Sequence, residues 1–291
     1  MTSEPPPIPG VRRSFVEARG VRFHVTEAGP ADGRPVLALH GWPQHHWAYN
    51  KLLADPPPGL RIIAPDLPGY GWSGPAPHKW AKEDVASDVL ALLDALGLDR
   101  VLVGHDWGAY IAWLMVLRAP ERFDGYLTLN MGYPWITPRM LLPHIGGLLQ
   151  YQPLIAFFGV PVQRYTKFLD FAFKVGSALD PETARIYTDR FRDPVVARAA
   201  RDTYRTFLLR EIPRAARHPE TRRATVPIRA LYGVNDAVIP ESWMAPETAN
   251  ADDYTLEKVD ATTHFIIDER ADLVRARLIA LAEETAPKPQ V

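Results

Sequence analysis

The stretch Val101-Leu102-Val103-Gly104-His105-Asp106-Trp107-Gly108 decides the fold that we expect for this chain. Three β-type apolar residues lead into a turn bracketed by two glycines, and helix-favouring apolar residues then run from 109 to 117. A strand, a tight turn and a helix in that order are typical of a nucleophile elbow, which presents one side chain above the carboxyl end of the strand. The glycines allow a sharp turn because they bring no Cβ clash. The side chain presented here is that of Asp106.

An aspartate at the elbow predicts a chemistry different from that of the serine usually found there. Its carboxylate attacks carbon without first losing a proton, and the attack leaves an ester on the protein. This chemistry suits displacement at a saturated carbon better than acyl transfer. We therefore predict that Asp106 is a covalent nucleophile. A serine-type esterase is disfavoured, because the serine that could replace it, Ser73, lies off the elbow.

Composition and charge limit the classes of protein that fit the sequence. The chain has 291 residues, enough for one large domain with an insertion or for two ordinary domains, and its 47% hydrophobic and 23% charged residues are typical of a globular protein. Its net charge of −1 gives no electrostatic reason to expect a nucleic acid or a membrane surface as a partner. The absence of cysteine excludes disulfides and thiolate metal sites, and we predict neither a metal nor a cofactor.

Targeting signals are missing from the sequence. The proline-rich N-terminus lacks the apolar core of a signal peptide. No stretch approaches the roughly 20 apolar residues that span a membrane. We therefore expect a cytoplasmic protein, and the sequence leaves open whether it is a monomer or a homodimer.

Short apolar runs and helical periodicity predict the secondary structure. Apolar runs bounded by proline or glycine are typical of buried strands, and a pair of alternating runs around Arg19-Gly20 is typical of a hairpin. The expected strands are 14–18, 21–27, 36–39, 61–64, 101–103, 126–129, 228–232 and 254–259. Apolar stripes predict helices over 83–96, which Gly97 would close, near 241–249 and over 267–284.

The order of these elements predicts an α/β fold with an insertion. Alternating strands and helices favour a mostly parallel sheet with helices on both faces. Residues 134–223 interrupt the alternation, because they show helical periodicity and many prolines but no convincing buried strand. We predict a core domain made of residues 1–133 and 224–291, with residues 134–223 inserted as a helical cap, or lid.

A nucleophilic aspartate also needs donors for the oxyanion that forms when its ester is hydrolysed. His40-Gly41-Trp42-Pro43 directly follows the expected strand 36–39, and Gly41 allows the backbone to approach closely. The backbone amides of Trp42 and Trp107 are the expected pair of donors. We also expect Pro43 to fix the loop through a cis peptide bond.

A base and an orienting acid complete the expected triad. His264 lies on the loop between the last strand and the last helix, above the carboxyl ends of the strands, where it could activate water. Asp236 follows the strand 228–232 and could hold and charge-stabilise His264. The alternative acid position, after strand 126–129, holds the uncharged Asn130. Asp260 is interpreted as a turn residue of the loop that carries His264.

The leaving group needs a donor, and the predicted cap offers four tyrosines. These are Tyr151, Tyr165, Tyr187 and Tyr204. A tyrosine hydroxyl can protonate a developing alkoxide or hydrogen-bond a halide. The pattern alone does not choose among the four. Aromatic candidates for a pocket that would bind a hydrophobic small molecule are Trp42, Trp107, Trp135, Phe157, Phe158 and Phe265, although each also suits an ordinary core.

Together these motifs resemble the alpha/beta-hydrolase superfamily, in its epoxide hydrolase and dehalogenase branch. The resemblance runs from about residue 14 to 284 and rests on segments 40–43, 66–73, 104–108 and 233–236 and on His264. It implies the alpha/beta-hydrolase fold with a cap, a small-molecule substrate that reacts with water, and no cofactor. It also implies two cap tyrosines in an epoxide hydrolase. Tyr151-Gln152, 45 residues after Asp106, and Tyr204-Arg205, 32 residues before Asp236, match their usual contexts.

The resemblance to the dehalogenases is weaker in detail. Haloalkane dehalogenases commonly have asparagine at the position of Trp42. Pro68 resembles fluoroacetate dehalogenases, but those enzymes grip the substrate carboxylate with arginines where this chain has Trp107 and Tyr110. Without that clamp a carboxylate would be poorly held in a dry pocket. They also carry a His-Trp pair where this chain has Tyr151-Gln152.

Three hypotheses follow for the function. The first is an epoxide hydrolase that opens an epoxide to a vicinal diol through an ester on Asp106, which water activated by His264 hydrolyses. The second is a haloalkane or haloacid dehalogenase that uses the same Asp106, His264 and Asp236. The third is a non-catalytic ligand-binding protein, because a fold does not dictate a function.

Overall fold

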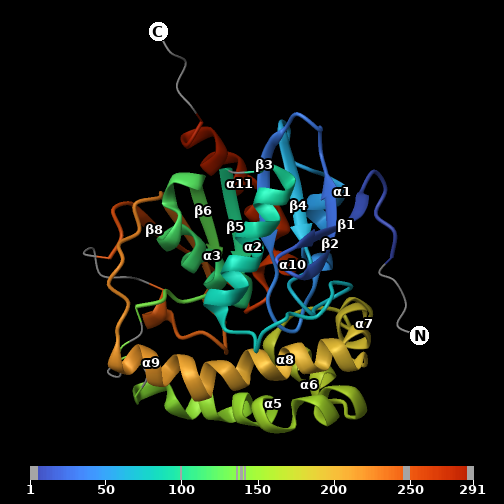
Figure 1. The fold of residues 1–291 in the computed structure, drawn as a ribbon, viewed down its shortest axis with the longest axis vertical. Coiled ribbons are helices and arrows are strands. Elements are labelled where there is room, and N and C mark those ends of the chain that lie inside the picture. Colours follow the sequence, from blue (N-terminus) through green and yellow to red (C-terminus); the bar gives the residue numbers. More distant parts are fainter. Residues whose placement is uncertain are drawn as a thin grey trace.

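Eight strands form one sheet in the computed structural model, which describes residues 6–98, 100–135, 137, 140, 142–244 and 250–286 (Figure 1). The strand order is β1-β2-β4-β3-β5-β6-β7-β8. The bounds are β1 (Arg12–Ala18), β2 (Val21–Ala28), β3 (Arg34–Leu39), β4 (Leu60–Pro65), β5 (Arg100–His105), β6 (Phe123–Leu129), β7 (Ile228–Gly233) and β8 (Tyr254–Val259). All the strands that the sequence predicts are present, and the chain has the expected alpha/beta-hydrolase fold.

The sheet is mostly parallel, as expected. Only β2 runs antiparallel to its neighbours, β1 and β4, whereas the strands from β4 to β8 in the sheet order pair in parallel. The predicted hairpin turns at Arg19-Gly20, where both residues have positive φ angles of 47° and 78°. Because the parallel strands end at one edge of the sheet, the loops that follow β3, β5, β6, β7 and β8 come together there.

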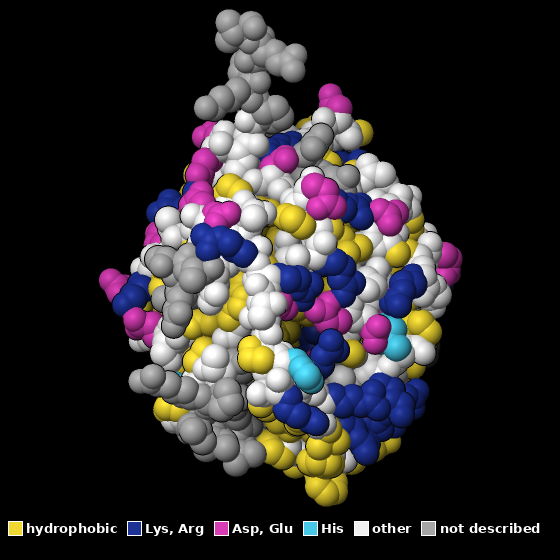
Figure 2. All heavy atoms as spheres, turned by 60° about the vertical axis from the view of Figure 1, so that its left-hand side comes forward, with side chains coloured by type: hydrophobic (Ala, Val, Ile, Leu, Met, Phe, Trp, Pro, Cys, Tyr) yellow, Lys and Arg dark blue, Asp and Glu magenta, His cyan; other side chains and the backbone are white. Residues whose placement is uncertain are grey.

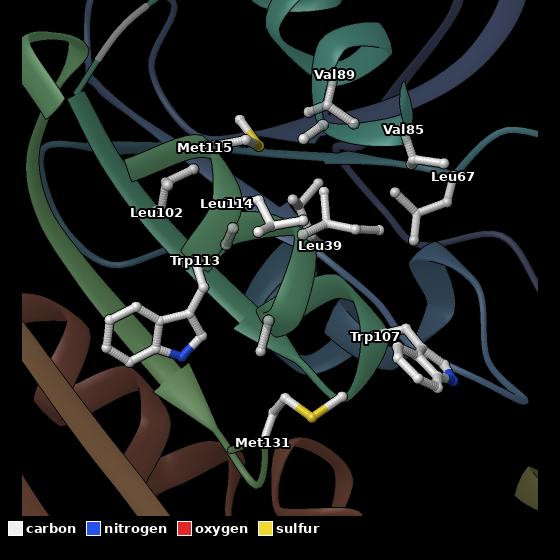
Figure 3. Close-up of a cluster of buried hydrophobic side chains, with 14 of the residues drawn as sticks. Leu39, Leu67, Val85, Val89, Leu102, Trp107, Trp113, Leu114, Met115 and Met131 are labelled. Atoms are coloured by element: carbon white, nitrogen blue, oxygen red, sulfur yellow. The ribbon is translucent and has the colours of Figure 1, made fainter. Parts of the chain in front are cut away.

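Helices cover both faces of the sheet, and the strand residues alternate between them. Leu37 and Leu39 of β3 belong to the apolar cluster that contains helices α2 (Lys82–Leu96) and α3 (Trp107–Arg118). Val36 and Ala38 belong to the cluster on the other face, with α1 (Asn50–Ala54) and α11 (Ala271–Glu284). This alternation is the period of two expected for a strand that is buried on both sides. Figure 3 shows the first cluster, in which α2 and α3 meet β3 and β5.

Two predictions about helices need correction. The helix expected over 267–284 is two helices, α10 (Ile266–Glu269) and α11, because the backbone of Arg270 leaves the helical region at φ −129° and ψ 45°. The helix expected near 241–249 begins as a short 3-10 turn, η5 (Glu241–Trp243), and residues 245–249 lie outside the described part of the chain. Helix α2 is as predicted, and Gly97 closes it at a φ of 64°.

The described residues between β6 and β7 are mostly helical. Their elements are the 3-10 turn η3 (Leu142–His144), α5 (Ile145–Tyr165), α6 (Phe168–Gly176), α7 (Pro181–Arg190), α8 (Pro194–Thr206), the π-helical turn η4 (Phe207–Glu211) and α9 (Ile212–Arg217). Figure 1 shows them side by side beyond the carboxyl ends of the parallel strands. We call residues 134–223 the cap segment, and its boundaries as a separate domain stay a prediction.

The outward side of α5 is apolar, which the sequence analysis did not anticipate. Phe157 and Phe158, candidates for the pocket, are instead 51% and 61% exposed, and Tyr165 is 72% exposed. Figure 2 shows hydrophobic and basic side chains together at the lower end of the molecule, where the cap segment lies. Even so, none of the described helices is both long and apolar enough to cross a membrane.

The packing between α2, α3 and the sheet predicts the effect of a core substitution. Leu102 is fully buried, so Leu102→Ala should lower the free energy of unfolding by about 2–5 kcal/mol, the range for deleting buried leucine. Leu209, which is 52% exposed, serves as the matched control, and Leu209→Ala should stay within about 0.5 kcal/mol of the wild type. Guanidinium unfolding measures both variants. Equal losses for the two would contradict the burial of Leu102.

Candidate active site

Asp106 occupies the elbow with a left-handed backbone. It lies between the last residue of β5 and the first residue of α3, at φ 51° and ψ −129°. Its backbone N–H donates to the carbonyl oxygen of Leu129 at 3.3 Å, and its carbonyl oxygen accepts from the N–H of Tyr110 at 3.1 Å. A non-glycine residue adopts such a conformation only where its surroundings enforce it.

Two glycines are required beside the elbow for close approach. A Cβ atom at Gly41 would lie 2.2 Å from Asp106 Oδ1, and one at Gly108 would lie 2.3 Å from the carbonyl oxygen of Leu39. Neither glycine has a positive φ. The positive φ belongs to the aspartate itself, and the glycines leave room for the loop after β3 to reach its carboxylate.

One of the two predicted oxyanion donors contacts the carboxylate directly. The backbone N–H of Trp42 donates to Asp106 Oδ1 at 2.7 Å, and the peptide bond between Trp42 and Pro43 is cis, as predicted. The N–H of Trp107 is the first of helix α3 and has no partner within the helix. Among the hydrogen bonds of the described residues, none joins it to Asp106.

His264 lies between two carboxylates. Its Nε2 is 3.4 Å from Asp106 Oδ2, and its Nδ1 is 2.9 Å from Asp236 Oδ2. All three side chains are nearly inaccessible to solvent. The structure therefore brings together the three residues of the expected triad, in the order that a nucleophile, a base and an orienting acid require.

Asp236 is held by more donors than the sequence indicated. Its Oδ2 also accepts from Asn130 Nδ2 at 2.6 Å, and its Oδ1 accepts from the backbone N–H groups of Val238 and Ile239 at 2.6 and 3.0 Å. Burial opposes ionisation of this carboxyl, but His264 and these donors outweigh it, so the pKa of Asp236 is lowered. Asn130 occupies the alternative acid position, and its side-chain amide donates a hydrogen bond to Asp236, the predicted acid.

The charge of His264 depends on both carboxylates. Burial alone would lower the pKa of its imidazole, but the negative charges of Asp236 and Asp106 raise the pKa from an ordinary 6.5 to about 10. At neutral pH the resting site therefore holds an imidazolium between two carboxylates. Removing either negative charge moves the pKa of His264 back toward the range in which it can accept a proton.

The two tyrosines picked out by the resemblance meet above the elbow. The hydroxyl oxygens of Tyr151, on α5, and Tyr204, on α8, are 3.4 Å apart. The Trp42 ring stacks on Tyr151 at 5.6 Å, and the Trp107 ring lies edge-on to Tyr204, also at 5.6 Å. Burial raises the pKa of both phenols, so both remain neutral hydrogen-bond donors.

The other two cap tyrosines do not share this place. Tyr165 faces solvent. Tyr187 is buried, and its hydroxyl donates to Asp268 Oδ1 at 2.7 Å. Packing of α5 against α8 thus selects the same two tyrosines, Tyr151 and Tyr204, that the resemblance indicated.

A cavity of about 50 Å3 adjoins Asp106. A single water needs about 10–15 Å3, so this space admits a small ligand group. Its walls are mostly apolar, as ligand sites usually are, and are formed by Asp106, Trp107, Tyr110, Met131, Gly132, Tyr133, Met140, Tyr151, Gln152, Phe207, Val238, Ile239 and Trp243. A neighbouring groove of about 350 Å3 shares five of these residues, Tyr151, Gln152, Val238, Ile239 and Trp243.

Of the six aromatic candidates for the pocket, Trp107 alone lines this cavity. Trp42 lies behind Tyr151, and its indole N–H donates to Gln163 Oε1 at 3.0 Å. Trp135 packs on Trp113 at 5.4 Å, and Phe265 packs on Phe173 at 4.9 Å.

Most wall residues were missed because they follow strands as ordinary apolar loop residues. Met131 comes just after β6, and Ile239 lies on the loop after β7. Their position at the carboxyl edge of the sheet is the signal that could have found them.

Trp107 carries an unused donor. Its indole Nε1 is buried and has no hydrogen-bond partner among the described residues. Buried donors normally find a partner, so one that lies beside a cavity points to a ligand or water as its partner. The side chain of Trp107 therefore offers a hydrogen bond next to Asp106.

One buried cluster in the described residues has the spacing of a metal site, away from Asp106. It consists of His24, His46 and Asp66. Each imidazole Nδ1 lies 2.9 Å from an Asp66 oxygen, and the backbone N–H groups of His46 and Trp72 donate to the same carboxylate at 2.8 and 2.9 Å. Four N–H donors satisfy the carboxylate, and this arrangement explains the cluster without an ion.

Comparison with known proteins assigns the class of the protein. The family model described as the alpha/beta hydrolase fold matches residues 34–271. Since this match covers most of the chain, the protein belongs to the alpha/beta hydrolase family.

Among its relatives are proteins named for one reaction. A protein of Mus musculus named Epoxide hydrolase 4 is 31% identical over 163 residues, which are 55% of this chain and 44% of that protein. The protein of Homo sapiens with the same name is 27% identical over 293 residues, 94% of this chain and 79% of that protein. A solved structure of a Vigna radiata epoxide hydrolase mutant has a TM-score of 0.79 at 19% identity, covers 94% and 99% of the two chains, and shows the shared fold.

The two carboxylates beside His264 make its titration testable. Asp106→Asn should lower the pKa of His264 below its wild-type value of about 10, because one negative charge is lost. The raised pKa favours the folded state fully below about 6.5, and this contribution disappears as the pH rises toward 10. In the Asp106→Asn variant, the free energy of unfolding should therefore fall less than in the wild type as the pH rises from about 6.5 to about 10.

NMR titration of the His264 ring measures the shift, and unfolding experiments at several pH values measure the stability. Asp32 is exposed, so Asp32→Asn is the control and should leave both unchanged. A His264 pKa that Asp106→Asn does not move would contradict the electrostatic link.

Proposed function

We propose that this protein is an epoxide hydrolase that opens an epoxide to a vicinal diol through a covalent ester on Asp106. The observation that carries the proposal is the pair of hydroxyls of Tyr151 and Tyr204, 3.4 Å apart beside the nucleophile position. Two neutral donors that converge can bind one oxygen atom between them and stabilise the charge that develops on it. Relatives named epoxide hydrolases support the same reaction.

Ring opening uses the two oxygens of Asp106 differently. The Trp42 amide holds Oδ1, which leaves Oδ2 to attack an epoxide carbon from behind its C–O bond. The new C–O bond forms as the ring bond breaks, and the ring oxygen receives a proton from Tyr151 or Tyr204. The proton on His264 then restores the phenol. Oδ1 becomes the ester carbonyl oxygen, still facing the Trp42 amide.

Hydrolysis of the ester follows from the loss of charge on Asp106. The ester is neutral, so only Asp236 continues to hold a proton on His264, and the imidazole becomes a base. His264 takes a proton from water as its oxygen attacks the ester carbonyl carbon, and the Trp42 amide stabilises the charge on Oδ1. When the ester bond breaks, His264 protonates the departing alkoxide. The acid formed on Asp106 returns a proton to His264, which restores the resting pair.

A second candidate, haloalkane dehalogenase chemistry, is favoured by one observation. The indole N–H of Trp107 is buried without a partner, and such a donor can bind a leaving halide. The same nucleophile, base and acid would serve, and a halide would leave in place of the alkoxide. A neutral tyrosine pair is better suited to an oxygen that needs a proton, which is why the epoxide is the first candidate.

A matched pair of substrates separates these candidates. The wild-type protein is incubated with 1,2-epoxyhexane or with 1-bromohexane. We expect 1,2-hexanediol from the epoxide and no release of bromide ion from 1-bromohexane. Chromatography measures the diol and ion analysis measures the bromide. Bromide release without diol would replace the first candidate by the second.

Removal of the base should trap the intermediate. His264→Gln with 1,2-epoxyhexane should gain the mass of one epoxide, and fragmentation should locate it on Asp106, because ester formation does not need the base and hydrolysis does. Intact-protein mass spectrometry makes the measurement. The double variant Asp106→Asn with His264→Gln is the control and should gain nothing. If no epoxide or halide tested leaves an adduct, the remaining hypothesis is a ligand-binding protein.

The tyrosine pair gives a further prediction. Tyr151→Phe and Tyr204→Phe together should slow ester formation by about 10²–10⁴-fold, the usual contribution of general acid catalysis. Each single variant should lose less, because one hydroxyl remains. Rapid-mixing measurement of ester formation gives the rate. Tyr165→Phe alters an exposed tyrosine and is the matched control. Equal rates for the double variant and this control would contradict the role of the pair.

A further inference from the structure

A buried chain of polar side chains joins the cap segment to the loop of His264. The hydroxyl of Tyr187, on α7, donates to Asp268 Oδ1 at 2.7 Å. Nε2 of Gln44 donates to Oδ2 of Asp268 at 2.6 Å. Oε1 of Gln44 lies 3.0 Å from Nδ1 of His105, and Nε2 of His105 lies 2.7 Å from the backbone carbonyl oxygen of His264. Four residues form this hydrogen-bonded series and take no part in the proposed chemistry: Tyr187, Asp268, Gln44 and His105.

The positions of the protons follow from which atoms can donate. The carbonyl oxygen of His264 only accepts, so Nε2 of His105 carries a hydrogen. In a neutral imidazole Nδ1 then carries none, and it must accept from the NH2 group of Gln44. This proton pattern requires the two ends of the Gln44 amide to be exchanged by a 180° rotation, so that its oxygen faces Asp268 in place of Nε2. Two oxygens at such a short distance need a proton between them, and only Asp268 can supply it.

The alternative is a charged pair with the same number of protons. His105 would be an imidazolium and Asp268 a carboxylate, with the Gln44 amide oriented as in the structure, Nε2 toward Asp268 and Oε1 toward His105. Both charges would be buried, because these residues are 0% and 4% exposed, and buried charges are costly. The imidazolium would also lie 5.0 Å, between ring centroids, from the positively charged ring of His264. Burial lowers the pKa of His105 to about 4 and raises that of Asp268 to about 7. Both shifts favour the neutral forms of the two side chains.

The neighbouring acid of α10 makes a second link of the same kind. Glu269 Oε2 accepts from the backbone N–H of Thr263, the residue before His264, at 2.8 Å. Its Oε1 accepts from the N–H of Ala178, between α6 and α7, at 2.9 Å. Both acids of this short helix therefore connect the cap segment to the backbone that carries His264.

We propose that Asp268 is a positioning residue, held as a neutral carboxylic acid, that fixes the backbone of His264 to helix α7 through Gln44 and His105. By this link the docking of the cap segment sets how far the His264 ring stands from Asp106. The protonation of Asp268 rests on the donors available along this hydrogen-bonded series and on the burial of His105 and Asp268, and it does not depend on the proposed function. Its effect on ester hydrolysis rests on the proposed function.

Several charged or titratable groups surround Asp268 and act on its proton. Lys51, on α1, donates from Nζ to the Asp268 backbone oxygen at 2.6 Å and favours ionisation, whereas burial and Glu269 oppose it. The phenols of Tyr49 and Tyr187 stay neutral, because burial and Asp268 raise their pKa values. As the pH rises through about 7, Asp268 loses its proton and Gln44 loses the donor that orients it. Ester hydrolysis should then slow.

The proton positions are measured directly by NMR of protein with 15N-labelled histidine. Below pH 7 we expect His105 to carry a hydrogen on Nε2 and none on Nδ1. A His105 ring protonated on both nitrogens would overturn the proposal, because Asp268 would then be ionised. This measurement needs no substrate, so it decides the state of Asp268 even if no epoxide reacts.

Two substitutions of Asp268 distinguish the effect of its hydrogen bonds from the effect of its titration. Asp268→Asn keeps an N–H donor for Gln44 and an oxygen for Tyr187, so the rate of ester hydrolysis with 1,2-epoxyhexane should stay within about twofold and lose its decline above pH 7. Asp268→Leu removes both partners and should slow ester hydrolysis about tenfold or more while ester formation is unchanged, since small displacements of a catalytic group are costly. Single-turnover mass spectrometry follows the ester.

The outcomes that overturn the positioning role are distinct. Asp268→Asn behaving like Asp268→Leu would contradict it, and so would equal slowing of ester formation and ester hydrolysis. If Asp268→Leu does not fold, Tyr187→Phe tests the same link from the cap side and should also slow only ester hydrolysis. A wild-type protein that forms no ester would instead count against the proposed function.

Discussion

The left-handed backbone of Asp106 is the constraint on which the site depends. A non-glycine residue in so rare a conformation is destabilised by about 1–3 kcal/mol, and fixed surroundings must offset this. A strand ends immediately before Asp106 and a helix begins immediately after it. Gly41 and Gly108 leave the space for the neighbouring loop. The direction of the carboxylate is therefore set by the main chain, and everything that acts on it, from Trp42 to His264, is arranged around a fixed point.

The carboxylates of Asp236 and Asp106 differ in the number of hydrogen bonds that they accept. Asp236 accepts four hydrogen bonds, including one from Asn130 and one from His264. Asp106 accepts one from Trp42 and faces His264 at the longer distance of 3.4 Å. Donors that stabilise a carboxylate also reduce its tendency to react. This difference in hydrogen bonding fits the proposed roles, in which Asp236 remains a counter-ion and Asp106 is the nucleophile.

Local sequence order predicted the strands, the elbow and the proximity of Asp106, Asp236 and His264, because these depend on short patterns and on which loops share one sheet edge. It did not predict the walls of the cavity. Helix α5 is apolar toward the core at Ile155 and toward solvent at Phe157 and Phe158, so periodicity gave no sign of which side faced inward. Asp268 gave no signal either, because an acid near the start of a helix is ordinary on a surface. Its burial depends on partners that are distant in sequence, Gln44 and Tyr187.

Tyr151 and Tyr204 come from α5 and α8, two helices packed against each other, whereas Asp106, Asp236 and His264 all follow strands of the sheet. In the proposed reaction, the groups that receive the departing atom and the groups that make and break the ester thus lie on different layers of the molecule. Substitutions along the helix pair would then change the environment of the leaving group while Asp106, Asp236 and His264 stay as they are. A change of leaving group would therefore leave the proposed ester cycle in place.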